Sequence, residues 1–385
     1  MADAKVTFFP VGNGDCVLIT LSDDAQMLID CNITEDSRDD DEESCYDVHA
    51  HLLECAKKLE GIVPHIDALA LTHPDQDHCR GLDTTFYTGD PASYGQTHLK
   101  QGLLLVDELW FTPRVFSPHE SDLCETAVAF RKEARRRMAL HKARAAACNL
   151  PGNRIRIIGY TDNPDLKGLE HLTTVPGNFL NFINGKQRTD FRFFVHAPFK
   201  IDTDDKWAER NDTSLVLQAR FDVDGVVDAA CAMFGGDAGP AIWEKILERS
   251  DEDTLKWDLL LAVHHCSWTF FSESPYKDNK VPAKASLKIL DQRRKGAHVV
   301  ASCKPILNDD DNPPHWAAAK LYKNAVGAES FHVTSETPSK KRPLPIDFVI
   351  SSNGPVLEEN SGKSVIASSA AVRSAVGTPK TYGRR

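Results

Sequence analysis

Apolar and polar positions alternate in short blocks along the N-terminal third of the chain. The opening stretch KVTFFPVGNGDCVLITL predicts two strands around a glycine turn, and AQMLIDC predicts a third strand that ends at Asp30. Residues 46–62, YDVHAHLLECAKKLEGI, carry apolar residues at helical spacing and predict a helix that ends near Gly61. HIDALALTH predicts a further buried strand. This third of the chain is therefore expected to contain three strands, a helix and a fourth strand.

The same pattern returns in the second half of the chain. FRFFVHAPF, TSLVLQARF, AACAMFGGD, DLLLAVHH, AHVVASC and PIDFVISS predict buried strands, and GPAIWEKILERS predicts a helix. Residues 84–190 fit the pattern poorly, with one strand, LLLVDELWFT, and one long helix over residues 120–148. We interpret residues 1–355 as one domain with an insertion at about 84–190. Residues 356–385, rich in Ser, Ala and Gly, are expected to form a disordered tail.

Charge and composition narrow the class of protein. The chain has 385 residues and a net charge of −11, which argues against a general polyanion binder. The acidic run 35–43 is expected to be a solvated loop, whereas residues 131–144 hold seven Lys/Arg, which fits either a solvated helix face or contact with a phosphate backbone. Without a long apolar segment, a signal-peptide pattern or a CxxC pair, we expect a cytoplasmic protein with no membrane contact and with reduced cysteines.

Potential metal ligands follow four of the predicted strands. They are Asp30, the four charged residues of HPDQDH (His73, Asp75, Asp77 and His78), Asp237 in FGGDAG, and His264 and His265 in AVHHCSW. Ends of separate strands can converge on one sheet edge, and imidazole and carboxylate groups are suitable ligands for Zn²⁺, Mn²⁺ or Fe. The alternatives are a polar surface loop for HPDQDH, a helix N-cap for Asp237, and an ordinary buried and exposed pair for the two adjacent histidines.

These segments together resemble the metallo-β-lactamase fold. HPDQDH is similar to its HxHxDH signature, and closer to the HxDxDH version in the nuclease-like domain of ComEC-type competence proteins. FPVGNGDCVLI is similar to the VGQGD strand pair of that subgroup, and MLIDC, HAPF, NDTSLVL, FGGDAG and AVHHCS follow in the family order. Asn32 and Cys266 each stand where glycine is usual. The resemblance implies an α+β fold, the αβ/βα sandwich, in which two mixed sheets pack face to face with helices outside and a helical insertion is added.

The resemblance also implies a role for each site residue. His73 and Asp75 would bind one metal ion and Asp77 and His78 a second, Asp237 would bridge the two, and His264, in preference to His265, would complete the second site. Asp77 would also hold or accept a proton from the attacking water. Asp30 and Asn211 or Ser214 would be near neighbours of the ligands. In the hydrolytic mechanism that such a metal site favours, Asp212 or Ser214 would orient the substrate.

Two departures from the family pattern bear on the choice of metal. Asp75 stands where many relatives have histidine, and no clear histidine lies between HPDQDH and Asp237, although His196 is one candidate. Oxygen ligands shift the preference from Zn²⁺ towards Mn²⁺ or Mg²⁺. We expect one or two divalent ions per chain, Mn²⁺ or Zn²⁺ or else Mg²⁺, with the tighter binding at the second site.

The function that these expectations favour is metal-dependent hydrolysis by a phosphodiesterase or nuclease that uses a metal-activated hydroxide on a nucleic acid or nucleotide substrate. Hydrolysis of a small molecule, such as a cyclic nucleotide, lactone or ester, stays open. So does a non-catalytic module of the same fold whose insertion binds a partner protein. By analogy with stand-alone ComEC-like proteins, the chain is expected to belong to a bacterial multi-gene system, including antiviral defence.

Overall fold

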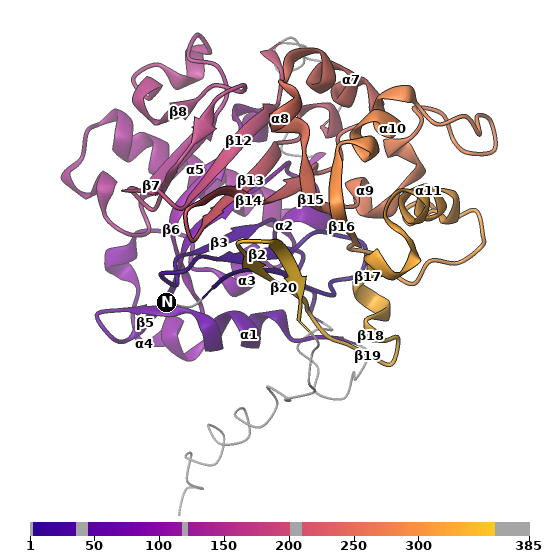
Figure 1. Ribbon diagram of the computed structural model, residues 1–385. Helices are drawn as coiled ribbons and strands as arrows, with labels where there is room; N and C mark the ends of the chain where they lie inside the picture. The colour runs from indigo at the N-terminus through magenta and orange to yellow at the C-terminus, as the bar shows by residue number, and fades with distance from the viewer. Residues whose placement is uncertain (1–2, 36–44, 118–121, 201–209, 359–385) are drawn as a thin grey trace, which may run out of the picture.

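The computed structural model describes residues 3–35, 45–117, 122–200 and 210–358 (Figure 1). Most of the acidic run 35–43 and nearly all of the predicted tail 356–385 lie outside the described residues. In the part of the chain that is described, no helix combines the length and the apolar character needed to cross a membrane.

The first sheet is mixed. Within the described ranges it has ten strands in the order β21-β20-β1-β2-β3-β5-β6-β7-β8, with β4 paired to β5. The pairs from β21 to β3 are antiparallel, and the pairs β3-β5, β5-β6, β6-β7 and β7-β8 are parallel. β4 pairs with β5 in the antiparallel direction. The bounds are Ala4–Phe8 (β1), Val17–Thr20 (β2), Gln26–Ile29 (β3), Lys57–Leu59 (β4), Val63–Ala70 (β5), Leu105–Phe111 (β6), Arg154–Ile158 (β7), Thr173–Thr174 (β8), Ile346–Ser351 (β20) and Gly354–Leu357 (β21).

The second sheet is also mixed and comes mainly from the second half of the chain. Its seven strands among the described residues follow the order β17-β16-β15-β14-β13-β12-β9. β9, β12, β13 and β14 are antiparallel, and β14 to β17 are parallel. The bounds are Phe179–Leu180 (β9), Phe191–Ala197 (β12), Val216–Val223 (β13), Val226–Phe234 (β14), Trp257–Leu261 (β15), Arg293–Ala301 (β16) and Phe331–Val333 (β17).

Alternate residues of the strands face two different apolar cores, because successive side chains of a strand point to opposite faces. Ile19 of β2 and Leu259 of β15 belong to one central core that both sheets share. Their chain neighbours face outward, with Leu18 in a core beneath the helices of the first sheet and Leu260 in a core beneath those of the second. The order of layers is therefore helix, sheet, sheet, helix.

Helices cover the outer face of each sheet (Figure 1). On the first sheet they are α1 (Val48–Cys55), α3 (Leu82–Thr85) and α5 (Glu125–Lys142), and on the second α7 (Pro240–Arg249), α10 (Lys284–Asp291) and α11 (Trp316–Val326). Shorter helices are α2 (Gln76–Cys79), α4 (Gln96–Lys100), α8 (Glu252–Leu255) and α9 (Val263–Cys266). The expected α+β class, with mixed sheets flanked by helices, is confirmed at this level.

Most of residues 84–190 continue the first sheet, whereas β9 near their end joins the second sheet. β6, β7 and β8 extend the first sheet beyond β5, and α5 packs on its outer face with Ala127, Phe130 and Ala134 buried. The expected insertion at about 84–190 thus shares its core with the N-terminal strands. The strands predicted at residues 5–21, 25–31, 65–73 and in the second half are all present.

The predicted helix 46–62 is shorter than its apolar spacing indicates. α1 ends at Cys55, Ala56 is extended, and Lys57–Leu59 forms β4 against the start of β5. The pairing of β4 with β5 overrides the helical pattern here, because residues 57–59 form hydrogen bonds with a strand that a further helical turn would leave without this partner.

Candidate metal centre

Loops at the ends of strands come together to form the candidate metal centre. They follow β3, β5, β14 and β15, or join β1 to β2. Backbone hydrogen bonds of 2.8–3.1 Å connect these loops. The N–H of Asp15 donates to the carbonyl of Asp77, that of Cys31 to His78, that of Leu215 to Thr72, and that of His264 to Gly236. Backbone contacts from both sheets therefore fix the loops that carry the polar side chains.

The turn between β1 and β2 approaches α2 closely because residue 14 is glycine. A Cβ at Gly14 would lie 2.6 Å from the carbonyl oxygen of Asp77 and 2.0 Å from Nδ2 of Asn32. Asn32, which replaces the glycine usual in the resembling family, donates from Nδ2 to the carbonyls of Val11 and Asn13 at 3.0 and 3.1 Å. The side chain of Asn32 therefore braces the turn that carries Asp15.

Asp237 is the centre of the cluster, because each of its carboxylate oxygens faces two histidines. Oδ1 lies 3.2 Å from Nε2 of His78 and 3.7 Å from Nε2 of His265. Oδ2 lies 3.3 Å from Nε2 of His264 and 3.5 Å from Nε2 of His73. The side chain of Asp237 is 3% exposed, so these contacts are shielded from water.

Two further aspartates divide the cluster into two subsites. Asp75 Oδ2 lies 3.7 Å from His73 Nε2, and Asp77 Oδ2 lies 3.3 Å from His265 Nε2. We define subsite 1 as His73, Asp75, His264 and Asp237 Oδ2, and subsite 2 as Asp77, His78, His265 and Asp237 Oδ1. One ligand atom from each residue of subsite 2 lies within 4.8 Å of all the others. Subsite 2 is accordingly the group best arranged to hold one ion.

The Nδ1 atom of each of the four histidines contacts a protein oxygen. The partners are Thr72 Oγ1 for His73 (3.1 Å), Asp30 Oδ2 for His78 (2.7 Å), Thr269 Oγ1 for His264 (2.7 Å) and Asp15 Oδ1 for His265 (3.1 Å). Asp30 also accepts hydrogen bonds from the backbone N–H and the hydroxyl of Thr72, each at 2.7 Å. Such outer contacts fix the orientation of a metal-binding imidazole, which leaves its Nε2 free to coordinate.

The inward-facing atoms fit a divalent cation. Nε2 of His73, His78 and His265 and Oδ1 of Asp237 are buried and have no hydrogen-bond partner among the described residues. A buried polar atom without a partner costs about 1–3 kcal/mol, so a cluster of four such atoms is costly unless a ligand satisfies them. Imidazole nitrogen and carboxylate oxygen are the donor atoms that Zn²⁺ and Mn²⁺ accept.

The charges of the cluster stabilise one another. Burial alone would lower the pKa of His265, but the carboxylates of Asp15 and Asp237 raise that pKa to about 10. The pKa of His78 is likewise raised well above its ordinary value, because Asp237 and Asp30 outweigh burial. Burial alone would raise the pKa of Asp237, but the adjacent His78, His73 and His265 hold it well below its usual range. Protons therefore compete with a cation for the Nε2 atoms of the site.

The structure places His265, and not His264, beside Asp77 and His78, which differs from the preference drawn from the resemblance. His264, His265 and Cys266 have φ angles of 51°, 53° and 65°, so the chain turns through three left-handed residues after β15. This turn directs His265 to subsite 2 and His264 to subsite 1. Cys266 stands where the resembling family usually has glycine. Its backbone is left-handed, a conformation that glycine adopts at little energetic cost and other residues adopt at a higher one.

Ser214 and Asp75 have contacts that refine their expected roles. Ser214 is buried, and its hydroxyl accepts a 3.4 Å hydrogen bond from the backbone N–H of Asp237, so it positions a ligand. Asp75 Oδ1 lies 2.9 Å from a guanidinium nitrogen of Arg210, whose side chain is 40% exposed. Arg210 therefore sets a positive charge at the solvent side of subsite 1.

The other expected residues lie farther from the ligand atoms or in neighbouring turns. Asn211 and Asp212 lie in the 3-10 turn Asn211–Thr213, directly before Ser214. His196 contacts the hydroxyl of Ser250 through Nδ1 at 3.1 Å, and burial lowers its pKa to about 3. The structure therefore does not bring His196 into the cluster.

Asp15, Thr72, Thr269 and Arg210 contribute to the site, although the sequence patterns did not single them out. Asp15 has the clearest signal, because it directly follows the glycine turn in GNGDC and lies two residues before β2. The other three lack one, because an isolated threonine or arginine beside a strand end is common in any protein.

No family model matches this sequence, and no curated protein matches it.

Proposed function

We propose that the protein is a metal-dependent phosphodiester hydrolase with a metallo-β-lactamase fold. The observation that carries this proposal is the position of Asp237, whose two oxygens face the two histidine pairs of subsites 1 and 2. A carboxylate in that position suits a bridge between two cations, and two-cation sites are well suited to phosphodiester cleavage.

The fold part of the proposal has two independent supports. Seven motifs occur in the order that the resembling family has, and the chain folds into two mixed sheets with helices on their outer faces. The motif residues Asp30, His73, His78, Asp237 and His265 lie together although they are far apart in sequence.

The residues of the site divide the chemistry among them. Bound divalent cations lower the pKa of water and neutralise charge on phosphate oxygens. His73, Asp75, His264 and Asp237 would hold one cation, and Asp77, His78, His265 and Asp237 the other. The side chain of Asp77 is 33% exposed, whereas that of Asp237 is 3% exposed. Asp77 is therefore the carboxylate of subsite 2 that can exchange a proton with the solvent side of the site.

Arg210 is the group best placed to orient an anionic substrate. Its guanidinium lies at the solvent side of subsite 1 beside Asp75, and its partial exposure leaves donors for a phosphate oxygen. We assign substrate orientation to Arg210 in place of Asp212 and Ser214.

A small phosphodiester is a second candidate substrate beside nucleic acid, because part of the basic helix serves the fold. Arg137 donates to the carbonyls of Val106 and Arg154, and Arg131 donates to that of Val115. Arg136 binds Glu133 and the carbonyl of Gly152. These three arginines therefore do not form a free phosphate-binding face.

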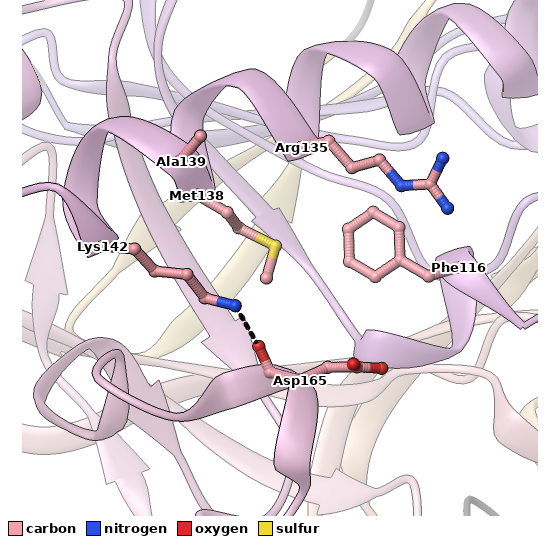
Figure 2. Close-up of a pocket in the computed structure, with 6 residues that line it drawn as sticks. All are labelled: Phe116, Arg135, Met138, Ala139, Lys142 and Asp165. Atoms are coloured by element: carbon pink, nitrogen blue, oxygen red, sulfur yellow. Dashed lines mark hydrogen bonds between the residues drawn. The ribbon is translucent and has the colours of Figure 1, made fainter.

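The surface of α5 offers a shallow hollow of about 270 Å³, shown in Figure 2. Lys142 donates to the carbonyl of Asp165 at 2.7 Å, and the guanidinium of Arg135 lies 5.4 Å from the ring centre of Phe116. None of the subsite residues lines this hollow, so we do not assign it to the reaction.

The test is hydrolysis by the full chain after reconstitution with Mn²⁺ or Zn²⁺. The substrates are a chromogenic phosphodiester, a cyclic nucleotide, single- and double-stranded DNA and RNA, and a carboxyl ester. We expect phosphodiester cleavage that Asp77→Asn abolishes and that Asp83→Asn, a change of an exposed carboxylate on α3, leaves intact. Absence of phosphodiester cleavage by a fully metallated protein would overturn the proposal.

A further inference from the structure

Two cysteines from distant parts of the chain meet beside subsite 2. Cys79 ends α2, directly after His78, and Cys124 is the N-cap residue of α5. Their sulfur atoms lie 3.8 Å apart, and neither cysteine is in a disulfide. This contact joins the turn that carries three ligands to the helix that covers the first sheet.

The surroundings of the pair give the two sulfurs different accessibility. Cys79 is fully buried, whereas Cys124 is partly exposed, so a small oxidant reaches Cys124 first. Thr126 Oγ1 lies 3.2 Å from Cys124 Sγ and 3.5 Å from Cys79 Sγ. A partly exposed thiol with a buried thiol in contact is the arrangement found in redox-reactive cysteine pairs.

The thiol of Cys124 is also the more acidic. The adjacent Cys79 and Thr126 side chains and the backbone N–H of Ala127 stabilise the thiolate of Cys124 and lower its pKa to about 5. The thiolate is the nucleophilic form of cysteine, so Cys124 is nucleophilic at neutral pH.

We propose that Cys79 and Cys124 are a peroxide-reactive pair, and that their oxidation to a disulfide weakens metal binding at the adjacent site. The Cys124 thiolate attacks hydrogen peroxide, which forms an S–O bond, breaks the O–O bond and releases hydroxide. The Cys79 thiol then attacks the sulfur of the resulting sulfenic acid, which forms the S–S bond and releases water. In total the two thiols lose two electrons to the peroxide, and two water molecules form.

The link to the metal centre is mechanical. The sulfurs must approach from 3.8 Å to about 2.05 Å in a disulfide. Cys79 Sγ now donates to the carbonyl of Asp75 at 3.1 Å, and the carbonyl of Asp122, two residues before Cys124, accepts from Arg210. Oxidation removes the first contact and moves both segments. Loss of contacts that support metal ligands typically lowers metal affinity by about 10–100-fold.

The first test is thiol mapping of the reduced full chain after treatment with one equivalent of hydrogen peroxide. Peptide mass spectrometry without reduction should find a Cys79–Cys124 linked peptide in the wild type and in Cys55→Ser, which removes an exposed thiol. Cys124→Ser should give no such peptide, and Cys79→Ser should leave a sulfenic acid on Cys124 that dimedone traps. Oxidation of Cys45, Cys55 or Cys148 while Cys79 and Cys124 stay reduced would overturn the proposal.

The second test is a calorimetric titration of the reduced chain and of the peroxide-treated chain with Mn²⁺ alone. The Kd for Mn²⁺ should rise at least tenfold on oxidation and return after reduction by dithiothreitol, and Cys124→Ser should show no change with peroxide. An unchanged Kd in the cross-linked protein would overturn the coupling. Mapping needs neither metal nor substrate, so a failure of this pair is distinguishable from a failure of the proposed hydrolase function.

Discussion

His264 and His265 are neighbours in sequence but belong to different subsites. We expect His265→Gln to lose the ion of subsite 2, and His264→Gln to keep it, because only His265 contacts Asp77. His265→Gln should also lower the free energy of unfolding by about 1–3 kcal/mol, because it removes the imidazole that contacts the buried Asp15.

Metal content at limiting Mn²⁺ and urea unfolding measure these two effects. The opposite result, in which His264→Gln loses the tightly held ion and His265→Gln retains it, would contradict the division of the site into the two subsites.

At this scale the residue types of the site could be predicted from the sequence, but not which of two adjacent histidines faces which subsite. HPDQDH, Asp237 and the histidine pair each follow a predicted strand. Their convergence was expected because the ends of separate strands can meet at one sheet edge, and because the resemblance groups them. The choice between His264 and His265 depends on three left-handed φ angles. No hydrophobic pattern encodes such a turn, and the usual marker, a glycine, is replaced by Cys266.

Among the elements, α5 shows how a basic run can stabilise the fold. The side chain of Arg137 is 2% exposed, and it pairs with Glu133 at 2.7 Å while it donates to carbonyls of β6 and β7. We expect Arg137→Met to lower the free energy of unfolding by about 1–3 kcal/mol, because these carbonyls lose a buried donor while Glu133 keeps its pair with Arg136.

The matched control on the same helix is Lys132→Met, because Lys132 is exposed. This change should stay within about 0.5 kcal/mol of the wild type. Both values come from urea unfolding, and equal destabilisation by the two substitutions would contradict a structural role for Arg137.

The elements that the sequence predicted least well are short or paired over long distances. β7 reads RIRII, a short run in which arginine and isoleucine alternate, and β8 has only two residues. Both join the first sheet through parallel pairing. β4 was interpreted as the last turn of a helix because Leu59 keeps the helical spacing. Its partner in β5 decides its conformation, and a local pattern cannot report that partner.

For the whole molecule, a bound cation is expected to stabilise the fold. The site joins loops from both sheets, so an ion that binds only the folded chain raises the free energy of unfolding by RT ln(1 + [M]/Kd), about 2.7 kcal/mol at a concentration of 100 Kd. Calorimetry should show a higher Tm with Mn²⁺ or Zn²⁺ and a lower Tm with excess chelator. A Tm that does not respond to metal or chelator would contradict the site.

Stability should also fall in mild acid, through a partly buried histidine, His332, that lies outside the candidate metal centre. Burial and the neighbouring His298 lower the pKa of His332 to about 4, against an unfolded value of about 6.5. Between these two pH values the unfolded chain therefore binds more protons than the folded chain. The contribution of His332 to the free energy of unfolding is fully present above pH 6.5 and is lost as the pH falls towards 4.

Allowing for the partial exposure of His332, we expect the change from pH 7 to pH 5 to cost about 1 kcal/mol at this residue. In urea unfolding, the free energy of unfolding of His332→Gln should fall by about 1 kcal/mol less than that of the wild type between pH 7 and pH 5. An identical pH dependence in the two proteins would rule out this source.

The overall arrangement was predictable as a class but not as a strand order. Alternating strands and outer helices indicate layered sheets, and the resemblance supplied the sandwich. The extension of the first sheet by residues from 84–190 could not be predicted, because sheet neighbours are set by contacts between segments far apart in sequence.

The most direct test of the central claim is the metal content of the purified chain after reconstitution with Mn²⁺ or Zn²⁺, compared with Asp237→Asn and with Asp83→Asn. Because Asp237 faces both subsites, the account predicts one to two ions per chain in the wild type and in Asp83→Asn, and less than half of that amount in Asp237→Asn. Fewer than one ion per chain in the wild type, or equal metal content in Asp237→Asn, would contradict it.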